Sequence, residues 1–129
     1  MSKILAIDHG DARIGLAITD EEKKYSLAFD VIPAVPESEA ISKISEIIKK
    51  ENVEEIVLGL PISLSGEENK QALKVREFGE KISATGIKVN YLDERFSTKS
   101  SLQQSKIRGT QIDAEAAKLL LQTWLDKNR

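Results

Sequence analysis

The chain has 129 residues, of which 40% are hydrophobic and 31% are charged, and its formal net charge is −2. This length and composition predict a single domain over residues 1–129 with a substantial hydrophobic core. No apolar run approaches the roughly 20 residues that span a bilayer, so we expect no membrane partner. The absence of cysteine excludes disulfides and thiolate metal sites, and it fits a cytoplasmic location.

The N-terminal part of the chain predicts three strands. Residues 4–8 form a short apolar run that ends in an acid, and residues 13–19 form a second apolar run. The Gly10-Asp11 pair between them is a turn signal, so the two runs predict an antiparallel hairpin. Residues 25–32 alternate loosely and predict a third strand, which is followed by prolines.

The middle of the chain predicts two helices that alternate with two strands. Residues 38–50 carry isoleucines at helical spacing, and residues 67–84 predict a second helix with Leu73, Phe78 and Ile82 among its core candidates. The apolar run 55–60 is β-branched and predicts a buried, parallel strand. Residues 87–92 predict the fifth strand.

The C-terminal part predicts two more helices. Ser97 or Thr98 can cap a helix that reaches about residue 107, and Gly109 with its neighbouring threonine breaks it. Asp113 is a suitable N-cap for the last helix, and Trp124 lies on the apolar face of that helix.

The resulting element order predicts an α/β fold. Three hairpin-linked strands followed by two βα units predict a mixed five-stranded sheet flanked by helices on both faces. Ligands of open α/β sheets bind beyond the carboxyl ends of the strands. Asp8 ends the first strand, Glu94 follows the fifth and Asp113 opens the last helix, so we expect these carboxylates to converge.

Three converging carboxylates favour a divalent metal site. Mg²⁺ and Mn²⁺ take oxygen ligands from carboxylates and from substrate phosphates, which predicts a metal-dependent enzyme acting on phosphodiesters. Neighbouring residues of a strand face opposite ways, so only one of Asp93 and Glu94 should face the site. The same alternation points His9 away from Asp8, and we expect it to pack beneath the site.

Four motifs in the same order resemble the YqgF family over almost the whole chain. They are Asp8-x-Gly10-x-x-Arg13-x-Gly15-x-Ala17, Gly59-Leu60-Pro61 with Gly66 downstream, Asp93-Glu94-Arg95-x-Ser97-Thr98, and Asp113-x-x-Ala116-Ala117. Members of this family are described as Holliday junction resolvases and as nucleases that mature the 5′ end of pre-16S ribosomal RNA. The resemblance implies a ribonuclease H-like fold of order βββαβαβα, in which the acidic triad of the family falls on Asp8, Glu94 and Asp113.

The resemblance implies a hydrolase that binds two Mg²⁺ or Mn²⁺ ions through this triad and cleaves structured RNA or branched DNA. The slightly acidic balance suits a large DNA junction poorly, which favours ribosomal RNA and ribosomal precursor particles as partners. Residues 62–66 and 108–112 depart from the Asn-rich or acidic and the basic patterns of the family, and they leave the substrate open. Both a monomer and a homodimer remain compatible with the sequence.

Other residues near the motifs have two interpretations each. Arg13 and Arg95 could bind a substrate phosphate or pair with a neighbouring acid. Gly10 and Gly15 are expected to serve the hairpin turn and close packing. Lysines at 70, 74 and 81 share one helical face, which could follow a nucleic-acid backbone but is more often a solvated surface.

Two other functions fit parts of the pattern. A phosphate-binding module of the actin and sugar-kinase type also starts with Asp-x-Gly and a hairpin, but it needs two lobes, and 129 residues supply one. A non-catalytic nucleic-acid scaffold with the same fold is disfavoured by the complete acidic triad.

Overall fold

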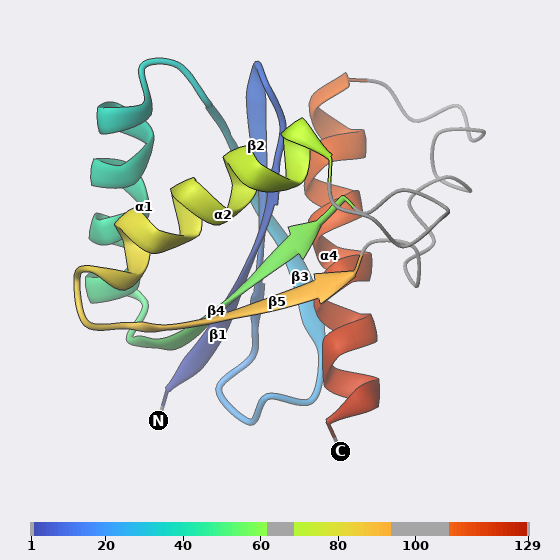
Figure 1. The fold of residues 1–129 in the computed structure, drawn as a ribbon. Helices are drawn as coiled ribbons and strands as arrows, with labels where there is room; N and C mark the ends of the chain where they lie inside the picture. The colour runs from blue at the N-terminus through green and yellow to red at the C-terminus, as the bar shows by residue number, and fades with distance from the viewer. Residues whose placement is uncertain (1, 62–68, 94–108, 129) are drawn as a thin grey trace.

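The computed structural model describes residues 2–61, 69–93 and 109–128, in which five strands and three helices are present (Figure 1). These elements are β1 (Lys3–His9), β2 (Arg13–Thr19), β3 (Ser26–Pro33), α1 (Glu37–Lys50), β4 (Val53–Leu60), α2 (Lys70–Ser83), β5 (Lys88–Asp93) and α4 (Gly109–Lys127). None of the helices in this described part of the chain is long and apolar enough to cross a membrane.

The strands form one mixed sheet in the order β3-β2-β1-β4-β5. β1 pairs antiparallel with β2 and parallel with β4, and β5 adds a further parallel strand. The predicted five-stranded mixed sheet is therefore confirmed, and β1 is its central strand. In Figure 1 both termini lie at one end of the molecule, whereas the β1–β2 hairpin and the start of α4 lie at the other.

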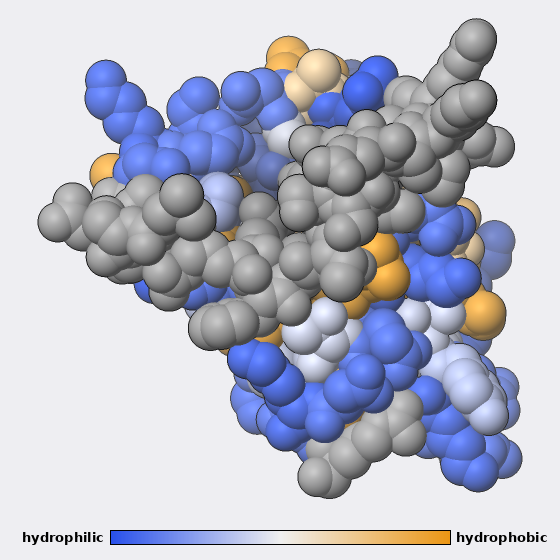
Figure 2. Space-filling view, turned by 90° about the vertical axis from the view of Figure 1, so that its right-hand side faces the viewer, coloured by the Kyte–Doolittle hydropathy of each residue, from blue (hydrophilic) through white to orange (hydrophobic). Residues whose placement is uncertain are grey.

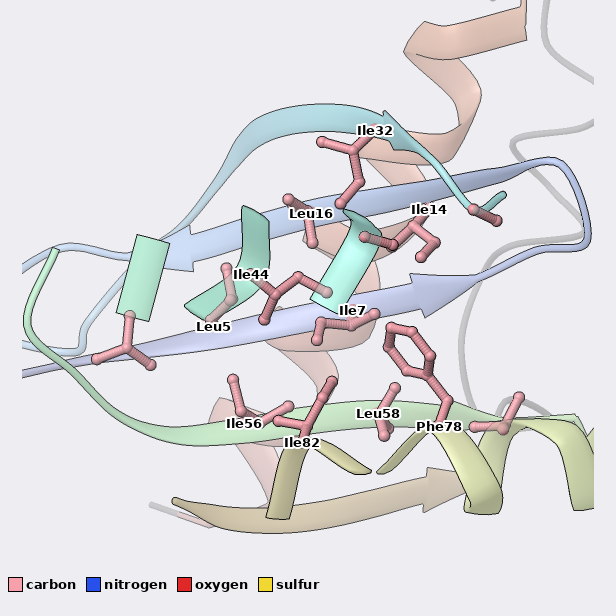
Figure 3. Close-up of a cluster of buried hydrophobic side chains, with 14 of the residues drawn as sticks. Leu5, Ile7, Ile14, Leu16, Ile32, Ile44, Ile56, Leu58, Phe78 and Ile82 are labelled. Atoms are coloured by element: carbon pink, nitrogen blue, oxygen red, sulfur yellow. The ribbon is translucent and has the colours of Figure 1, made fainter. Parts of the chain in front are cut away.

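Helices cover both faces of the sheet, as predicted. Leu5 and Ile7 of β1 belong to the cluster beneath α1 and α2, whereas Ile4 and Ala6 belong to the cluster beneath α4. This split arises because successive side chains of a strand point to opposite faces of the sheet, and β1 is buried on both faces. Figure 3 shows the larger cluster, in which Phe78 of α2 points toward the central strands.

The start of α2 and one of its predicted core residues differ from the expectation. The helix begins at Lys70, because the side chain of Asn69 caps it by accepting a hydrogen bond of 3.0 Å from the Ala72 backbone N–H. Leu73 was expected in the core, but its side chain is 57% exposed. The buried row of α2 is formed by other residues: Ala72, Val75, Phe78, Gly79 and Ile82. Leu73 lies one step around the helix from this row.

Replacement of Leu73 with alanine should therefore change the free energy of unfolding by less than about 0.5 kcal/mol, as is usual for a surface position. Ile82→Val removes only one methylene, but from a fully buried site, and should cost about 0.5–1.5 kcal/mol. Urea unfolding of both variants measures the difference. A larger cost for Leu73→Ala than for Ile82→Val would contradict this assignment of the core.

The last helix also begins earlier than predicted. α4 starts at Gly109, so Asp113 lies inside the helix and does not cap it. Aspartate favours N-caps when only local preference acts, but here tertiary contacts hold its backbone and its side chain against β2. Trp124 packs against the cluster beneath α4, as expected. The helix predicted between Ser97 or Thr98 and residue 107 lies outside the described residues.

Candidate functional site

Asp8 is a buried acid on the central strand. It lies one residue before the end of β1, and only 4% of it is exposed. It follows Ile4 and Ala6 at two-residue spacing, so its side chain faces α4. A buried carboxylate is costly unless hydrogen bonds or a cation compensate for the lost hydration. Asp8 is therefore not one of many surface acids, and its place requires specific partners.

A close contact between β2 and α4 brings Asp113 to the same place. Gly15 is the direct partner of Asp8 in the antiparallel pair of β1 and β2. A Cβ atom on Gly15 would lie 2.0 Å from the carbonyl oxygen of Asp113 and 2.4 Å from its carbonyl carbon. The backbone of α4 thus touches the sheet at the residue next to Asp8, and only glycine allows this approach. The structure brings Asp8 and Asp113 together, as predicted.

Arg13 orients the side chain of Asp113. Its Nε donates a hydrogen bond of 2.7 Å to Oδ2 of Asp113, and both side chains are partly exposed. The bond joins the first residue of β2 to α4 across 100 positions of sequence. Of the two interpretations of Arg13, pairing with a neighbouring acid is therefore confirmed. A guanidinium also carries donors on its Nη atoms, so one arginine can hold a carboxylate and contact a phosphate.

The other two predicted site residues, Glu94 and Arg95, lie outside the described residues. Their neighbours in β5 are informative. Tyr91 packs against the cluster beneath α1 and α2, whereas Leu92 belongs to the cluster beneath α4. Alternation therefore assigns Asp93 to the face away from Asp8. Of the adjacent acids, Glu94 remains the predicted member of the site.

The donor chemistry of this site suits a hard divalent cation. Among residues 2–61, 69–93 and 109–128, no group of three or more acids, histidines or cysteines could hold a metal ion. The described part of the site supplies two carboxylates, Asp8 and Asp113, which offer the oxygen ligands that Mg²⁺ and Mn²⁺ prefer. A cation favours carboxylates that the fold brings to one place, because its charge offsets their repulsion. These residues therefore fit a divalent metal, with Glu94 as the expected third ligand.

His9 packs beneath the site, as expected. Its ring lies 4.6 Å from the ring of Phe78, centroid to centroid, on the face covered by α1 and α2. Burial lowers the pKa of His9, although the nearby Glu37, Asp11 and Asp8 carboxylates oppose this effect. Its Nδ1 atom is buried and has no hydrogen-bond partner within the described part of the chain. His9 thus supports the strand end and does not face the two acids.

Ser26 is a supporting residue that the sequence did not indicate. Its Oγ donates a hydrogen bond of 2.9 Å to the carbonyl oxygen of Lys118, which ties α4 to β3. The helix that carries Asp113 is thereby fastened to the sheet beyond its apolar face. A serine at the start of a strand has no pattern that would predict this contact.

The lysines of α2 form no continuous basic track. Nζ of Lys74 lies 3.6 Å from Oδ1 of Asp11 in the β1–β2 hairpin, and Lys81 pairs with Glu37 at the start of α1. These ion pairs offset the positive charge, so a solvated surface is the better interpretation of the stripe.

Figure 2 shows the side of the molecule where α4 lies. Hydrophilic residues dominate the described surface there, and hydrophobic ones form small separate areas.

A cavity elsewhere does not compete with this site. A hollow of about 550 Å³ lies where the C-terminal ends of α1 and α2 meet the start of β4, and its lining includes Lys49, Val53 and Gly86. Among the described residues, Glu54 is the only acid in its lining, so no pair of described carboxylates faces it. The hollow lies at the end of the sheet opposite Asp8.

Comparison with known sequences identifies close relatives. The family model described as "RuvX: Holliday junction resolvase" matches residues 2–127. A "Putative pre-16S rRNA nuclease" of Dictyoglomus thermophilum is 36% identical over 134 residues, which cover 98% of this chain and 96% of the relative. A protein of the same name from Maridesulfovibrio salexigens is 34% identical and covers 95% of this chain and 97% of the relative.

Comparison with solved structures supports the fold. The structure described as "T. thermophilus RuvC in complex with Holliday junction substrate" superposes with a TM-score of 0.65 at 14% identity. The match covers 99% of this chain and 96% of that one. A second structure of Thermus thermophilus RuvC gives the same TM-score at 11% identity. These similarities confirm the ribonuclease H-like fold predicted from the sequence.

Proposed function

Because the chain belongs to the RuvX family, we propose that it is a metal-dependent nuclease that processes the 5′ end of pre-16S ribosomal RNA. One observation carries the chemical part of this proposal: Asp8 is buried on the central strand, and α4 brings Asp113 beside it through the contact at Gly15. Acids held together in this way can bind a hard cation, whereas without a cation their mutual repulsion lowers the stability of the fold.

Asp8 and Asp113 would hold Mg²⁺ or Mn²⁺, with Glu94 as the third ligand predicted by the sequence. When bound, two such ions supply an activated water and stabilise the leaving oxygen of a phosphodiester. The protein contributes position. β1 holds Asp8 in the middle of the sheet, and Arg13 fixes the direction of the Asp113 carboxylate at 2.7 Å. The same guanidinium can donate to a substrate phosphate, and Arg95 is the second candidate for this role.

Two observations bear on the substrate. Curated relatives at 34–36% identity are named as pre-16S rRNA nucleases, and they match this chain over nearly its full length. The net charge of −2 and the ion-paired lysines of α2 offer little basic surface for a large DNA junction. Junction cleavage is the second candidate, because the family description names a Holliday junction resolvase.

One cleavage experiment with Mn²⁺ tests both substrates. Wild-type protein is incubated in parallel with an RNA that carries the 5′ precursor region of 16S ribosomal RNA and with a four-way DNA junction. Cleavage of the RNA at a defined position supports the proposal. Cleavage of the junction alone would show that branched DNA, and not ribosomal RNA, is the substrate. If neither is cut, the nuclease proposal is contradicted, and the non-catalytic scaffold becomes the better interpretation.

Arg13→Gln tests the positioning of Asp113. The ion pair is partly exposed, so we expect a cost of less than about 1 kcal/mol in the free energy of unfolding. Loss of a group that orients a metal ligand typically reduces metal affinity or activity about 10–100-fold. A Mn²⁺ titration of the cleavage rate measures the effect. Lys74→Gln is the matched control, because it removes an exposed ion pair with Asp11 and should leave the titration unchanged.

A further inference from the structure

β3 is an edge strand with an unusual concentration of exposed apolar side chains. It pairs with β2 on one side, and no strand in the described part of the chain pairs with its other side. The described residues include five large apolar side chains that are exposed, and three of them lie at this edge: Tyr25 at 66%, Leu27 at 52% and Phe29 at 40%. An edge strand offers backbone N–H and C=O groups to another strand, and proteins usually shield such edges.

The three side chains gather on one face. Leu27 pairs with Ile18, which belongs to the cluster beneath α1 and α2, so Leu27 faces that side. Tyr25 lies two residues earlier and shares this face. A register shift leaves Phe29 as an extra residue between the partners of Leu16 and Ala17. Phe29 lines a hollow beside α1, so it also lies on this side.

The backbone hydrogen bonds show which groups of β3 face outward. The N–H of Asp20 donates to the carbonyl oxygen of Tyr25 at 3.2 Å, so the backbone groups of Tyr25 face β2. In antiparallel sheets this direction alternates along the strand. Leu27 therefore also turns its backbone groups toward β2, whereas Ser26 and Ala28 turn theirs toward the free edge.

From this pattern we propose that β3 is the contact surface of a homodimer, in which two copies pair antiparallel about a twofold axis at Leu27. In this register Ser26 of each copy exchanges hydrogen bonds with Ala28 of the other, through the groups that face outward. Leu27 then meets Leu27 of the second copy, and Tyr25 meets Phe29. The same three exposed apolar residues of each copy are covered at once, as expected for an isologous interface, in which one surface patch pairs with itself.

A groove beside β3 fits the incoming tyrosine. A hollow of about 260 Å³ is bounded by Phe29 and Asp30 of β3 and by residues at the C-terminal end of α1, namely Glu46, Ile47, Lys50 and Glu51. Tyr25 of the second copy lies opposite Phe29 and can enter this hollow. Its ring contacts Ile47 and Phe29, while its hydroxyl reaches the polar rim. Tyrosine is among the residues that most often contribute much of the binding energy when they fill a pocket of an interface.

The ends of β3 limit the length of this contact. The register shift and Pro33 end the regular pairing beyond this segment. The contact is therefore short, and its twofold symmetry closes it at two copies.

Sedimentation equilibrium over a range from low micromolar to near-millimolar protein tests the dimer. The apparent mass of the wild type should rise from 14.3 kDa toward twice that value. Leu27→Lys should remain a monomer, because two lysines would meet at the axis. Leu73→Lys makes the same change at an equally exposed leucine of α2 and should dimerise like the wild type. A monomeric wild type at all concentrations, or equal behaviour of the two variants, would overturn the proposal.

Cysteine variants test the register. The chain has no cysteine, so Leu27→Cys places a single thiol in each copy. Residues opposite each other in a non-hydrogen-bonded pair have Cα atoms about 4.5 Å apart, which a disulfide can bridge. Leu27→Cys should therefore cross-link rapidly under mild oxidation, whereas Ala28→Cys, opposite Ser26 and on the other face, should not. Equal rates for the two variants would refute the register and the proposed interface.

Discussion

Replacing Asp8 with asparagine is expected to abolish nucleic-acid cleavage while the protein still folds. Asparagine keeps the size of the side chain but removes its charge, and a metal ion then loses a ligand on the central strand. The charge stabilisation supplied by a metal is worth several kcal/mol, and about 1.4 kcal/mol corresponds to a tenfold change in rate, so the loss should be about a thousandfold or more. The fold should tolerate the change, because it also relieves repulsion between Asp8 and Asp113.

Cleavage rates with Mn²⁺ and urea unfolding measure the two halves of this expectation. Asp11→Asn is the matched control: it makes the same substitution three residues away, at an exposed acid that pairs with Lys74. Asp11→Asn should cleave like the wild type. An Asp8→Asn variant that is grossly unfolded would show that Asp8 is needed for structure, and one that cleaves normally would remove it from the site.

Metal binding can be read without cleavage. A ligand that binds the folded protein raises its melting temperature by mass action, so Mn²⁺ should stabilise the wild type. The rise should be much smaller in Asp8→Asn and unchanged in Asp11→Asn. An equal rise in Asp8→Asn and the wild type would place the bound metal elsewhere, whatever the cleavage assay shows.

Gly15→Ala is expected to have the second-largest effect, because the new methyl group meets the backbone of α4. The Cβ would lie 2.0 Å from the carbonyl oxygen of Asp113, which belongs to α4, while Gly15 itself is held in β2. No side-chain rotation can relieve this clash, so the helix must move away from the sheet. Overpacking typically costs about 1–3 kcal/mol, and we expect a value near the upper end. Cleavage should fall with it, because Asp113 moves away from Asp8.

Gly86→Ala separates this effect from ordinary destabilisation. Gly86 has a φ of 99°, and nothing lies within 4 Å of its Cβ position, so alanine there is strained but not crowded. Its cost should be about 1–2 kcal/mol. Gly86 lies between α2 and β5, at the end of the strands opposite Asp8. Cleavage by this variant should therefore match the wild type at a temperature where the variant is folded. Equal loss of cleavage in both glycine variants would show that Gly15 has no specific role at the site.

The strands and the buried acid were predictable because their signals are local. Short apolar runs separated by the Gly10-Asp11 turn indicate a hairpin, and Asp8 directly follows such a run. The two-residue period then assigns Asp8 and His9 to opposite faces, which the structure confirms. The expected topology added Asp113, as the acid that opens the last helix, and the family resemblance agreed with it.

The errors arose where local preference and tertiary contact compete. Asp113 has the propensity of an N-cap, but α4 begins at Gly109. Asp113 therefore lies inside the helix, where its backbone rests on Gly15 and its carboxylate pairs with Arg13. Leu73 is apolar, yet it lies beside the buried row of α2 and faces solvent. A window of helical sequence does not show which of two adjacent apolar positions the sheet will cover.

By itself, the sequence determined the α/β class, the hairpin and the placement of one acid at the end of a central apolar strand, since these depend on periodicity and turn chemistry over a few residues. The sequence predicted that Asp113 converges with Asp8, but only the tertiary structure showed the two contacts that bring it there: the backbone of Asp113 rests on Gly15, and Arg13 holds its carboxylate. Both contacts join residues about 100 positions apart. They depend on how α4 packs across the sheet, where one missing Cβ atom at Gly15 sets the distance between helix and strand.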